Sequence, residues 1–325
     1  MFVWQHPPSL PRLLRFAIVG ARSFWGGLKR PNFILYDHVH LAVLHATIAT
    51  LRSIPYGVFL HGIEVWEPLS GRRKEALLGA NILLTNSATT EVLARQANPW
   101  LPEPKVVWLG VRGNRPIADV STSPPSGLIV GRMASAERLK GHDAILDAWP
   151  HICAAVPDAR LVIVGTGNDE RRLRRRANSE GLRGIDFRGR VRDEERDRIY
   201  RSSRMLFYPS KQEGFGLAAA EAASFGLPVL GLAGTVTEEL FPPGTGAVLA
   251  RSLAKSDIVE AVAPLLRDAT LTSKLGRAAW ERVQNNFLEE HFQARFRKAL
   301  ADFVPYNEPQ FGSSNSQASD TIAQR

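Results

Sequence analysis

Short β-rich runs alternate with helical patterns along most of the chain, and this alternation is typical of α/β proteins with parallel sheets. One series of expected strands lies before residue 111, and a second series begins at residue 127. The predicted fold class is therefore α/β with two parallel sheets. The expected strands cover residues 32–37, 56–61, 81–87, 105–110, 127–133, 159–167, 185–191, 204–210 and 226–234.

The two series predict two domains, and the chain is long enough for each to bury a core. Residues 112–126, rich in Pro, Gly and Ser, are the expected linker between a first domain at 1–111 and a second at 127–287. The helical pattern at 288–304 is expected to cross back to the first domain. Residues 305–325 lack periodicity and are expected to form a disordered tail.

The chain is basic, with 41 Lys and Arg against 32 Asp and Glu, a formal net charge of +9. This excess favours anionic partners: nucleotide phosphates, an anionic membrane surface or nucleic acid. The arginine-rich run at 171–176 is interpreted as a solvated helix face, because no aromatic residues interleave with it, and no nucleic-acid partner is expected. The lone Cys153 excludes an intramolecular disulfide and is interpreted as core packing rather than as a nucleophile.

The chain is expected to be cytoplasmic. No uncharged run reaches the length of about 18 residues that a transmembrane helix needs. The first residues lack the layout of a signal peptide, since arginines interrupt their apolar run.

The stretch SKQEGFGLAAAE, residues 210–221, places two carboxylates around a Gly-Phe-Gly turn where a strand leads into a helix. Gly214 and Gly216 let the backbone approach a ligand, because neither has a Cβ. The first N–H groups of the following helix are free to bind oxygens of the same ligand. Glu213 and Glu221 could then bind separate hydroxyl groups of a polyhydroxylated ligand. The alternative is that Glu213 caps the helix and Glu221 is a solvated helix residue.

A second group of polar residues follows the strand at 127–133. Arg132 and Lys140 bracket a polar loop, where two cations could neutralise a diphosphate and stabilise it as a leaving group. Alternatively, both are ordinary surface charges. The Gly-x-Gly pair at 165–167 is weak evidence for NAD, because it lacks the rest of the dinucleotide fingerprint.

These stretches together resemble the retaining nucleotide-sugar glycosyltransferases of family four, which have the two-domain GT-B fold of Rossmann-like domains. The resemblance is specific over residues 127–249, and the first half of the chain resembles the family's acceptor domain more loosely. The stretches that carry it are VGRMASAERLKGHD, ARLVIVGTGNDERRLR, FRGRV, YPSKQEGFGLAAAEAASFGLPVLG and the loop at 232–235, then DHVHLAVL, FLHGIEVWEPL and ILLTNSATTEVLARQ in the first half.

The resemblance implies roles for the polar residues. Arg132 and Lys140 would bind the donor diphosphate, and Glu221 would hold the nucleotide ribose. Glu213 would contact the donor sugar as a catalytic-site residue. The turn Gly214, Phe215 and Gly216 would assist through its backbone.

His61 matches the family's acceptor-side histidine and could bind the acceptor or assist its hydroxyl; the alternative is a structural histidine. The family needs no metal and no cofactor besides its substrate, here a UDP- or GDP-sugar. With no evident covalent nucleophile, front-face attack with retention is the expected mechanism.

The function implied is transfer of a sugar from a nucleoside diphosphate to a glycan, lipid-linked or small-molecule acceptor in cell-surface polysaccharide assembly. One rival is a catalytically silent sugar-nucleotide-binding fragment or partner subunit. Another is a nucleotide-sugar epimerase with a GT-B fold, which the Glu213–Glu221 pattern argues against.

The resemblance also implies that the first domain lacks its first strands and glycine-rich loop. A start codon assigned too late, a truncated gene and a divergent product would each explain this. An incomplete sheet would leave an open strand edge. Residues 11–30 mix apolar and basic side chains, so they are expected either to contact the inner face of the membrane peripherally or to form a helix packed on the sheet.

Overall fold

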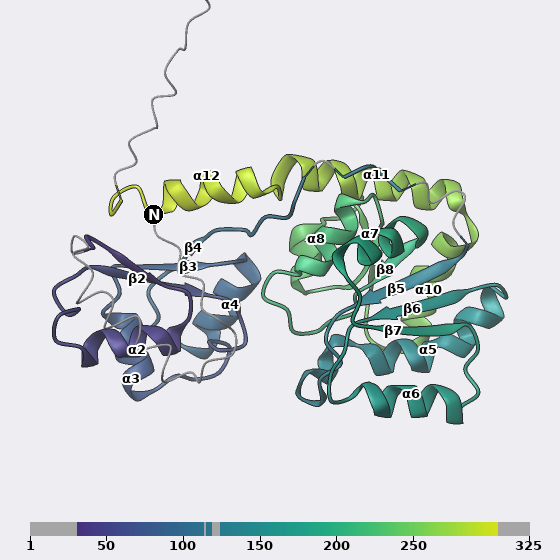
Figure 1. Cartoon of the computed structure of the whole chain (residues 1–325), viewed down its shortest axis with the longest axis horizontal. Helices are drawn as coiled ribbons and strands as arrows, with labels where there is room; N and C mark the ends of the chain where they lie inside the picture. The colour runs from purple at the N-terminus through teal and green to yellow at the C-terminus, as the bar shows by residue number, and fades with distance from the viewer. Residues whose placement is uncertain (1–30, 114, 119–123, 305–325) are drawn as a thin grey trace, which may run out of the picture.

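The computed structural model describes residues 31–304, except 114 and 119–123, and it contains two parallel sheets with helices packed on them (Figure 1). The features predicted for residues 11–30 and 305–325 lie outside the described residues. Within the described residues, no helix is long and apolar enough to cross a membrane.

The first sheet has four parallel strands in the order β1-β2-β3-β4. Its strands are β1 Ile34–Tyr36, β2 Tyr56–Leu60, β3 Ile82–Thr85 and β4 Lys105–Val106. The helices between them are α2 Val39–Thr47, α3 Gly71–Leu78 and α4 Ala88–Ala97.

Both faces of the first sheet are covered, which explains why β2 and β3 are apolar without alternation. Val58 and Leu60 pack in a cluster with residues of α2, α3 and α4. Phe59, between them on β2, points to the other face and packs with residues of helix α12, Glu289–Ala299. Figure 1 shows α12 lying along the first sheet, and the Lys105 Nζ donates to the Ala299 carbonyl at 3.4 Å.

The second sheet has six parallel strands in the order β10-β9-β8-β5-β6-β7. Its strands are β5 Ser126–Val130, β6 Arg160–Val164, β7 Ile185–Gly189, β8 Met205–Phe207, β9 Val229–Leu232 and β10 Ala247–Ala250. Its helical segments are η1 Ser135–Lys140, α5 His142–Ala155, α6 Glu170–Ser179, α7 Asp193–Ser202, α8 Leu217–Ser224, α9 Val236–Leu240, α10 Lys255–Arg267 and α11 Ala269–Asn286.

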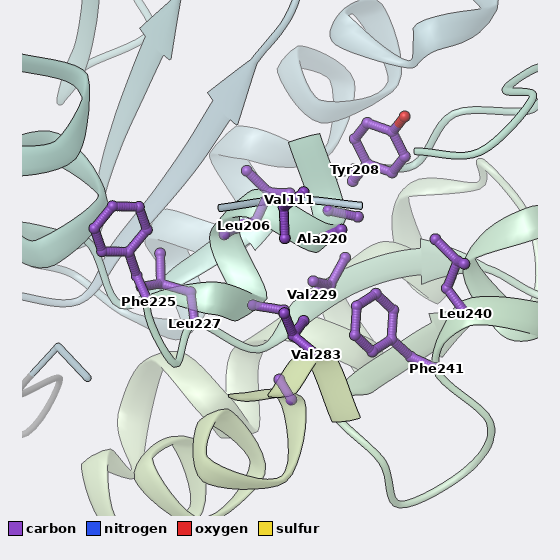
Figure 2. Packing of buried hydrophobic residues seen from close by; sticks show 14 of the residues in the cluster. Val111, Leu206, Tyr208, Ala220, Phe225, Leu227, Val229, Leu240, Phe241 and Val283 are labelled. Atoms are coloured by element: carbon purple, nitrogen blue, oxygen red, sulfur yellow. The ribbon is translucent and has the colours of Figure 1, made fainter. Parts of the chain in front are cut away.

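Two apolar clusters cover the two faces of the second sheet. One joins the strands to α5 and α10. The other joins them to α7, α8 and α11, and Figure 2 shows part of it, where Leu206 and Val229 of the sheet meet Ala220 of α8 and Val283 of α11. Helix α8 carries the end of the glycine turn, so this packing fixes the direction in which the turn enters the helix.

Several elements differ from the sequence-based expectation. Strand β4 ends at Val106 rather than at residue 110, because the chain leaves the sheet there: Val111 forms a bridge with Leu288, just before α12. Helix α5 continues through Pro150, although a proline inside a helical pattern predicts a bend or an interruption. Helix α9 and strand β10 were not predicted, since both are short and lie among turn-forming residues.

Gly276 of α11 generates a stability prediction. A Cβ at this position would lie 2.0 Å from the carbonyl oxygen of Gly226, in the turn that follows α8. Alanine is the better helix former by about 1 kcal/mol. The clash should outweigh this gain in helix propensity, so Gly276→Ala should lower the free energy of unfolding by about 1–3 kcal/mol. Thermal unfolding checks this, with the exposed Lys274→Ala on the same helix as the control; an equal or higher melting temperature for Gly276→Ala would contradict it.

Candidate active site

The loop with Arg132 and Lys140 follows β5, and a loop after β6 supports it through backbone hydrogen bonds. Gly131 N–H donates to the Val164 carbonyl, and Met133 N–H donates to the Thr166 carbonyl. A Cβ on Gly165 would lie 1.9 Å from the Gly131 oxygen, and one on Gly167 2.0 Å from the Met133 oxygen. The Gly-x-Gly pair therefore has a packing role: it lets the two loops approach each other.

Four charged side chains form a connected ion-pair chain at this edge of the sheet. Arg132 contacts Glu137 at 2.5 Å, and Lys140 contacts the other oxygen of Glu137 at 3.1 Å. Lys140 also contacts Glu213 at 3.3 Å. This ion-pair chain connects Arg132 and Lys140 to Glu213, three residues that the resemblance assigns to the donor site, and it adds Glu137, which the sequence did not single out.

The topology explains this meeting of distant residues. Strands β5 and β8 are neighbours in the parallel sheet, so the loops that follow them leave from the same edge. Lys140 closes the loop after β5, and Glu213 lies in the loop after β8. Their side chains are only partly exposed, at 24% and 18%.

The Gly-Phe-Gly turn links Glu213 to α8. Gly216 has a positive φ of 89° and forms the N-cap of α8, and Phe215 is buried in the core. Glu213 also accepts from the Ser210 hydroxyl at 3.4 Å. Burial raises the pKa of Tyr208 well above its usual value, and the neighbouring Glu213 carboxylate raises it further. Glu213 is thus held between a lysine and neutral hydroxyl groups.

Glu221 lies on α8, about 6 Å along the helix axis from Leu217 at its first position. The Tyr200 hydroxyl of α7 lies 3.3 Å from Glu221 Oε2. Burial raises the pKa of Tyr200 well above its usual value, and Glu221 adds to this effect. Tyr200 is therefore a neutral donor that orients the carboxylate of Glu221.

His61 follows β2, at the carboxyl edge of the first sheet. Its Nε2 lies 2.8 Å from Asp37 Oδ1, and its ring stacks on Phe59. The hydrogen bond with Asp37 raises the pKa of His61 above its ordinary value of 6.5, although burial acts in the opposite direction.

The backbone of His61, rather than its imidazole, contacts the donor-side loop. A Cβ on Gly214 would lie 1.7 Å from the His61 carbonyl oxygen. Asn86 donates to the same oxygen at 2.8 Å. The structure therefore places His61 next to the turn that carries Glu213, across the boundary between the two sheets.

The arginine run at 171–176 is largely occupied by ion pairs within its own domain. Arg172 pairs with Asp143 and Asp169, and Arg176 pairs with Asp143, Asp147 and Glu180. The hydrogen bonds from Arg172, and next from Arg138, hold the pKa of Asp169 down to about 2. These pairs join α6 to α5 and to the loop that supports Arg132.

Residues 31–304, leaving out 114 and 119–123, contain no group of three or more His, Cys, Asp or Glu side chains that could hold a metal ion. The expectation of a metal-independent protein stays a prediction.

Comparison with known proteins identifies the family. The family model described as "Glycosyl transferases group 1" matches residues 115–282, just over half of the chain. The chain belongs to this family. The match covers both loops of the ion-pair chain, while His61 lies outside it.

Two curated relatives illustrate the similarity. A "GDP-mannose-dependent monoacylated alpha-(1-6)-phosphatidylinositol monomannoside mannosyltransferase" of Corynebacterium glutamicum is 30% identical over 168 residues, covering 50% of this chain and 44% of the relative. A glycogen synthase of Mycobacterium tuberculosis is 30% identical over 263 residues, covering 78% of this chain and 60% of the relative. The chain thus spans less than two thirds of the length of these curated relatives.

Solved structures confirm the GT-B fold class expected from the sequence. A sucrose-phosphate synthase from Thermosynechococcus elongatus superposes with a TM-score of 0.74 at 20% identity, covering 92% of this chain and 82% of that one. Anabaena Alr3699/HepE, solved in complex with UDP and glucose, gives a TM-score of 0.72 at 18% identity, covering 91% and 84%.

The pair of His61 and Asp37 generates a prediction on pH dependence. Because the pKa of folded His61 is raised, the pair stabilises the fold fully below pH 6.5, and this contribution is lost as the pH rises through the raised value. Asp37→Asn should therefore lower the midpoint of the His61 titration, followed by NMR of the imidazole protons. The internal control is His142, whose pKa burial lowers to about 4. An unchanged His61 midpoint would show that Asp37 does not hold the ring.

Proposed function

We propose that the chain is a retaining glycosyltransferase that uses a UDP- or GDP-sugar as donor. Family membership supports sugar transfer, and one curated relative is named for GDP-mannose while one solved neighbour holds UDP and glucose. The donor would bind to the second domain, at the carboxyl edge of β5 and β8.

The observation that carries this proposal is the 3.3 Å contact between Lys140 and Glu213. It joins a cationic loop suited to a diphosphate with a carboxylate suited to sugar hydroxyls, so both ends of one activated sugar can be bound at once. A protein that binds a nucleotide but does not act on a sugar would need only the cationic loop. Glu221, oriented by Tyr200, is available for the ribose hydroxyls.

In the proposed mechanism, the acceptor hydroxyl attacks the anomeric carbon on the face from which the nucleoside diphosphate leaves. The bond between that carbon and the phosphate oxygen breaks, and the leaving phosphate accepts the proton of the acceptor. Arg132 and Lys140 would stabilise the negative charge that builds on the diphosphate. The turn Gly214–Gly216 would bind the sugar through its backbone groups.

The acceptor would approach from the first domain, where His61 lies beside Gly214. We propose a glycan or a lipid-linked acceptor in polysaccharide assembly. The name of the Corynebacterium relative, which refers to an acylated phosphatidylinositol mannoside, supports a lipid-linked acceptor. Peripheral membrane contact through residues 11–30 belongs to the same proposal.

Replacement of Glu213 tests the proposed function. Glu213→Gln keeps the shape of the side chain but removes the charge, so sugar transfer should fall by a factor of about 100 or more while the fold is retained. The measurement is release of UDP or GDP from a panel of nucleotide sugars, with and without acceptor, beside circular dichroism. Glu260→Gln, an exposed substitution whose partner Arg251 is also exposed, is the control. Nucleotide binding without release in the unaltered protein would favour a silent binding module instead.

Glu137 generates a second prediction, because its carboxylate lies between Arg132 and Lys140. A donor diphosphate that binds these cations must displace it, since two anions would otherwise share one site. Glu137→Gln should therefore tighten binding of UDP or GDP by about tenfold, with a larger gain at low salt. Isothermal titration calorimetry measures this, and Glu170→Gln, which removes a carboxylate of α6 paired with Arg174, is the control. Weaker binding by Glu137→Gln would mean that Glu137 supports the site instead.

A further inference from the structure

The N-terminus of α4, in the first domain, is bound by a carboxylate of the second domain. Glu239 of α9 accepts four hydrogen bonds: from Ala88 N–H at 2.8 Å, Thr89 N–H at 2.8 Å, the Thr89 hydroxyl at 2.7 Å and Trp108 Nε1 at 2.7 Å. The side chain of the N-cap Ser87 accepts from Thr90 N–H, and the Ala88 and Thr89 amides, in the first turn, have no acceptor within α4 itself. Glu239 supplies that acceptor from the other domain.

The same helix terminus binds the turn that carries Glu213. The Ser87 hydroxyl donates to the Gly214 carbonyl, at 2.5 Å, and the Thr90 hydroxyl donates to it at 3.2 Å. Gly214 is also in close backbone contact with His61. The position of the residue next to Glu213 is therefore set by the first domain, although Glu213 itself belongs to the second.

Trp108 extends this contact to the C-terminal helices. The guanidinium groups of Arg282 and Arg295 lie 5.7 and 5.2 Å from the centre of its ring. Arg282 also donates to the Leu240 carbonyl at 2.8 Å, next to Glu239, and Arg295 lies close to the Trp108 carbonyl at 3.5 Å. Glu239 thus bonds a tryptophan whose ring is fixed from both α11 and α12.

The neighbouring carboxylate shows that this role is specific to Glu239. Glu238 accepts from Gly234 N–H at 2.7 Å, within its own domain. The two oxygens of Glu239 each accept two hydrogen bonds, which uses the full acceptor capacity of a carboxylate. Charge-assisted bonds of this kind are stronger than neutral ones.

We propose that Glu239 is a positioning residue that holds the two domains in the arrangement in which Ser87 and Thr90 fix the Gly214 carbonyl. The contact couples the domain arrangement to the geometry of the turn beside Glu213. Its consequence for sugar transfer rests on the proposed function, whereas the coupling itself is a property of the fold.

The test uses the full chain with Glu239→Gln, which can accept on one oxygen only. The matched control is Glu91→Gln. It removes a carboxylate in the first turn of α4, and the ion-pair partner of that carboxylate, Arg95, lies on α4 too. In Glu239→Gln without ligand, hydrogen–deuterium exchange should become about tenfold faster at residues 88–89, which corresponds to about 1.4 kcal/mol. Exchange should also become about tenfold faster in the turn at 211–216, which Glu239 does not bond. The control should leave the turn unchanged.

Kinetics give the second readout. For Glu239→Gln, kcat for transfer should fall about tenfold, while the dissociation constant for UDP or GDP changes less than about twofold, because Arg132, Lys140 and Glu221 all belong to the second domain. A loss of binding and turnover together would indicate general destabilisation and overturn the positioning role.

A second pair of variants keeps the test independent of Glu239. Thr90→Val removes the hydroxyl that reaches Gly214, and Thr90→Ser keeps it. Exchange in the turn should accelerate with valine and return to the original rate with serine. If exchange at residues 211–216 is unchanged in both Glu239→Gln and Thr90→Val, the coupling does not exist. If the unaltered protein transfers no sugar, the proposed function fails, and the exchange data still decide the coupling.

Discussion

At Gly214 the backbone of the second domain touches the backbone of the first, and only a residue without a side chain permits this contact. A Cβ there would lie 1.7 Å from the His61 oxygen and 2.8 Å from Asn86 Nδ2. Because of this approach, the hydroxyls of Ser87 and Thr90, at the N-terminus of α4, can reach the Gly214 carbonyl. The carboxylate next to it, Glu213, is therefore fixed by two domains at once.

The cations at the candidate site are already paired with carboxylates, so an anionic ligand that bound them would have to replace a carboxylate. Arg132 and Lys140 are balanced by Glu137 and Glu213, which leaves the cluster close to neutral before any ligand binds. Without the carboxylates, Arg132 and Lys140 would repel each other, and the two carboxylates offset this repulsion. Under the proposed function, an incoming diphosphate would gain from the cations only by replacing Glu137 as their partner, whereas Glu213 would stay beside Lys140 and contact the sugar hydroxyls.

The sequence predicted most strands and the loops that follow them at the site, because these follow from local periodicity and from glycine turns next to polar residues. The ion pair of Lys140 and Glu213 could be anticipated, since both loops follow strands of one parallel sheet. Glu239 could not be anticipated, because its partners lie about 130 to 150 positions earlier in the chain and the pattern of a five-residue helix indicates nothing about them. Nothing in the sequence singled out Tyr200 or Tyr208, because their hydroxyls matter only through the carboxylates that the fold brings to them.

The part of the chain matched by the family model does not contain everything that shapes its own site. Residues 115–282 include Arg132, Lys140, Glu213 and Glu221, yet Gly214 is held by Ser87 and Thr90. The orientation of that first domain depends in turn on Glu239 and on α12, which packs against the first sheet from beyond the matched region. Three separate contacts, at Gly214, at Glu239 and along α12, restrain rotation of one domain against the other more than any single contact could. The residues proposed to bind the sugar nucleotide can therefore lie in one domain while their geometry is set by the segments on either side.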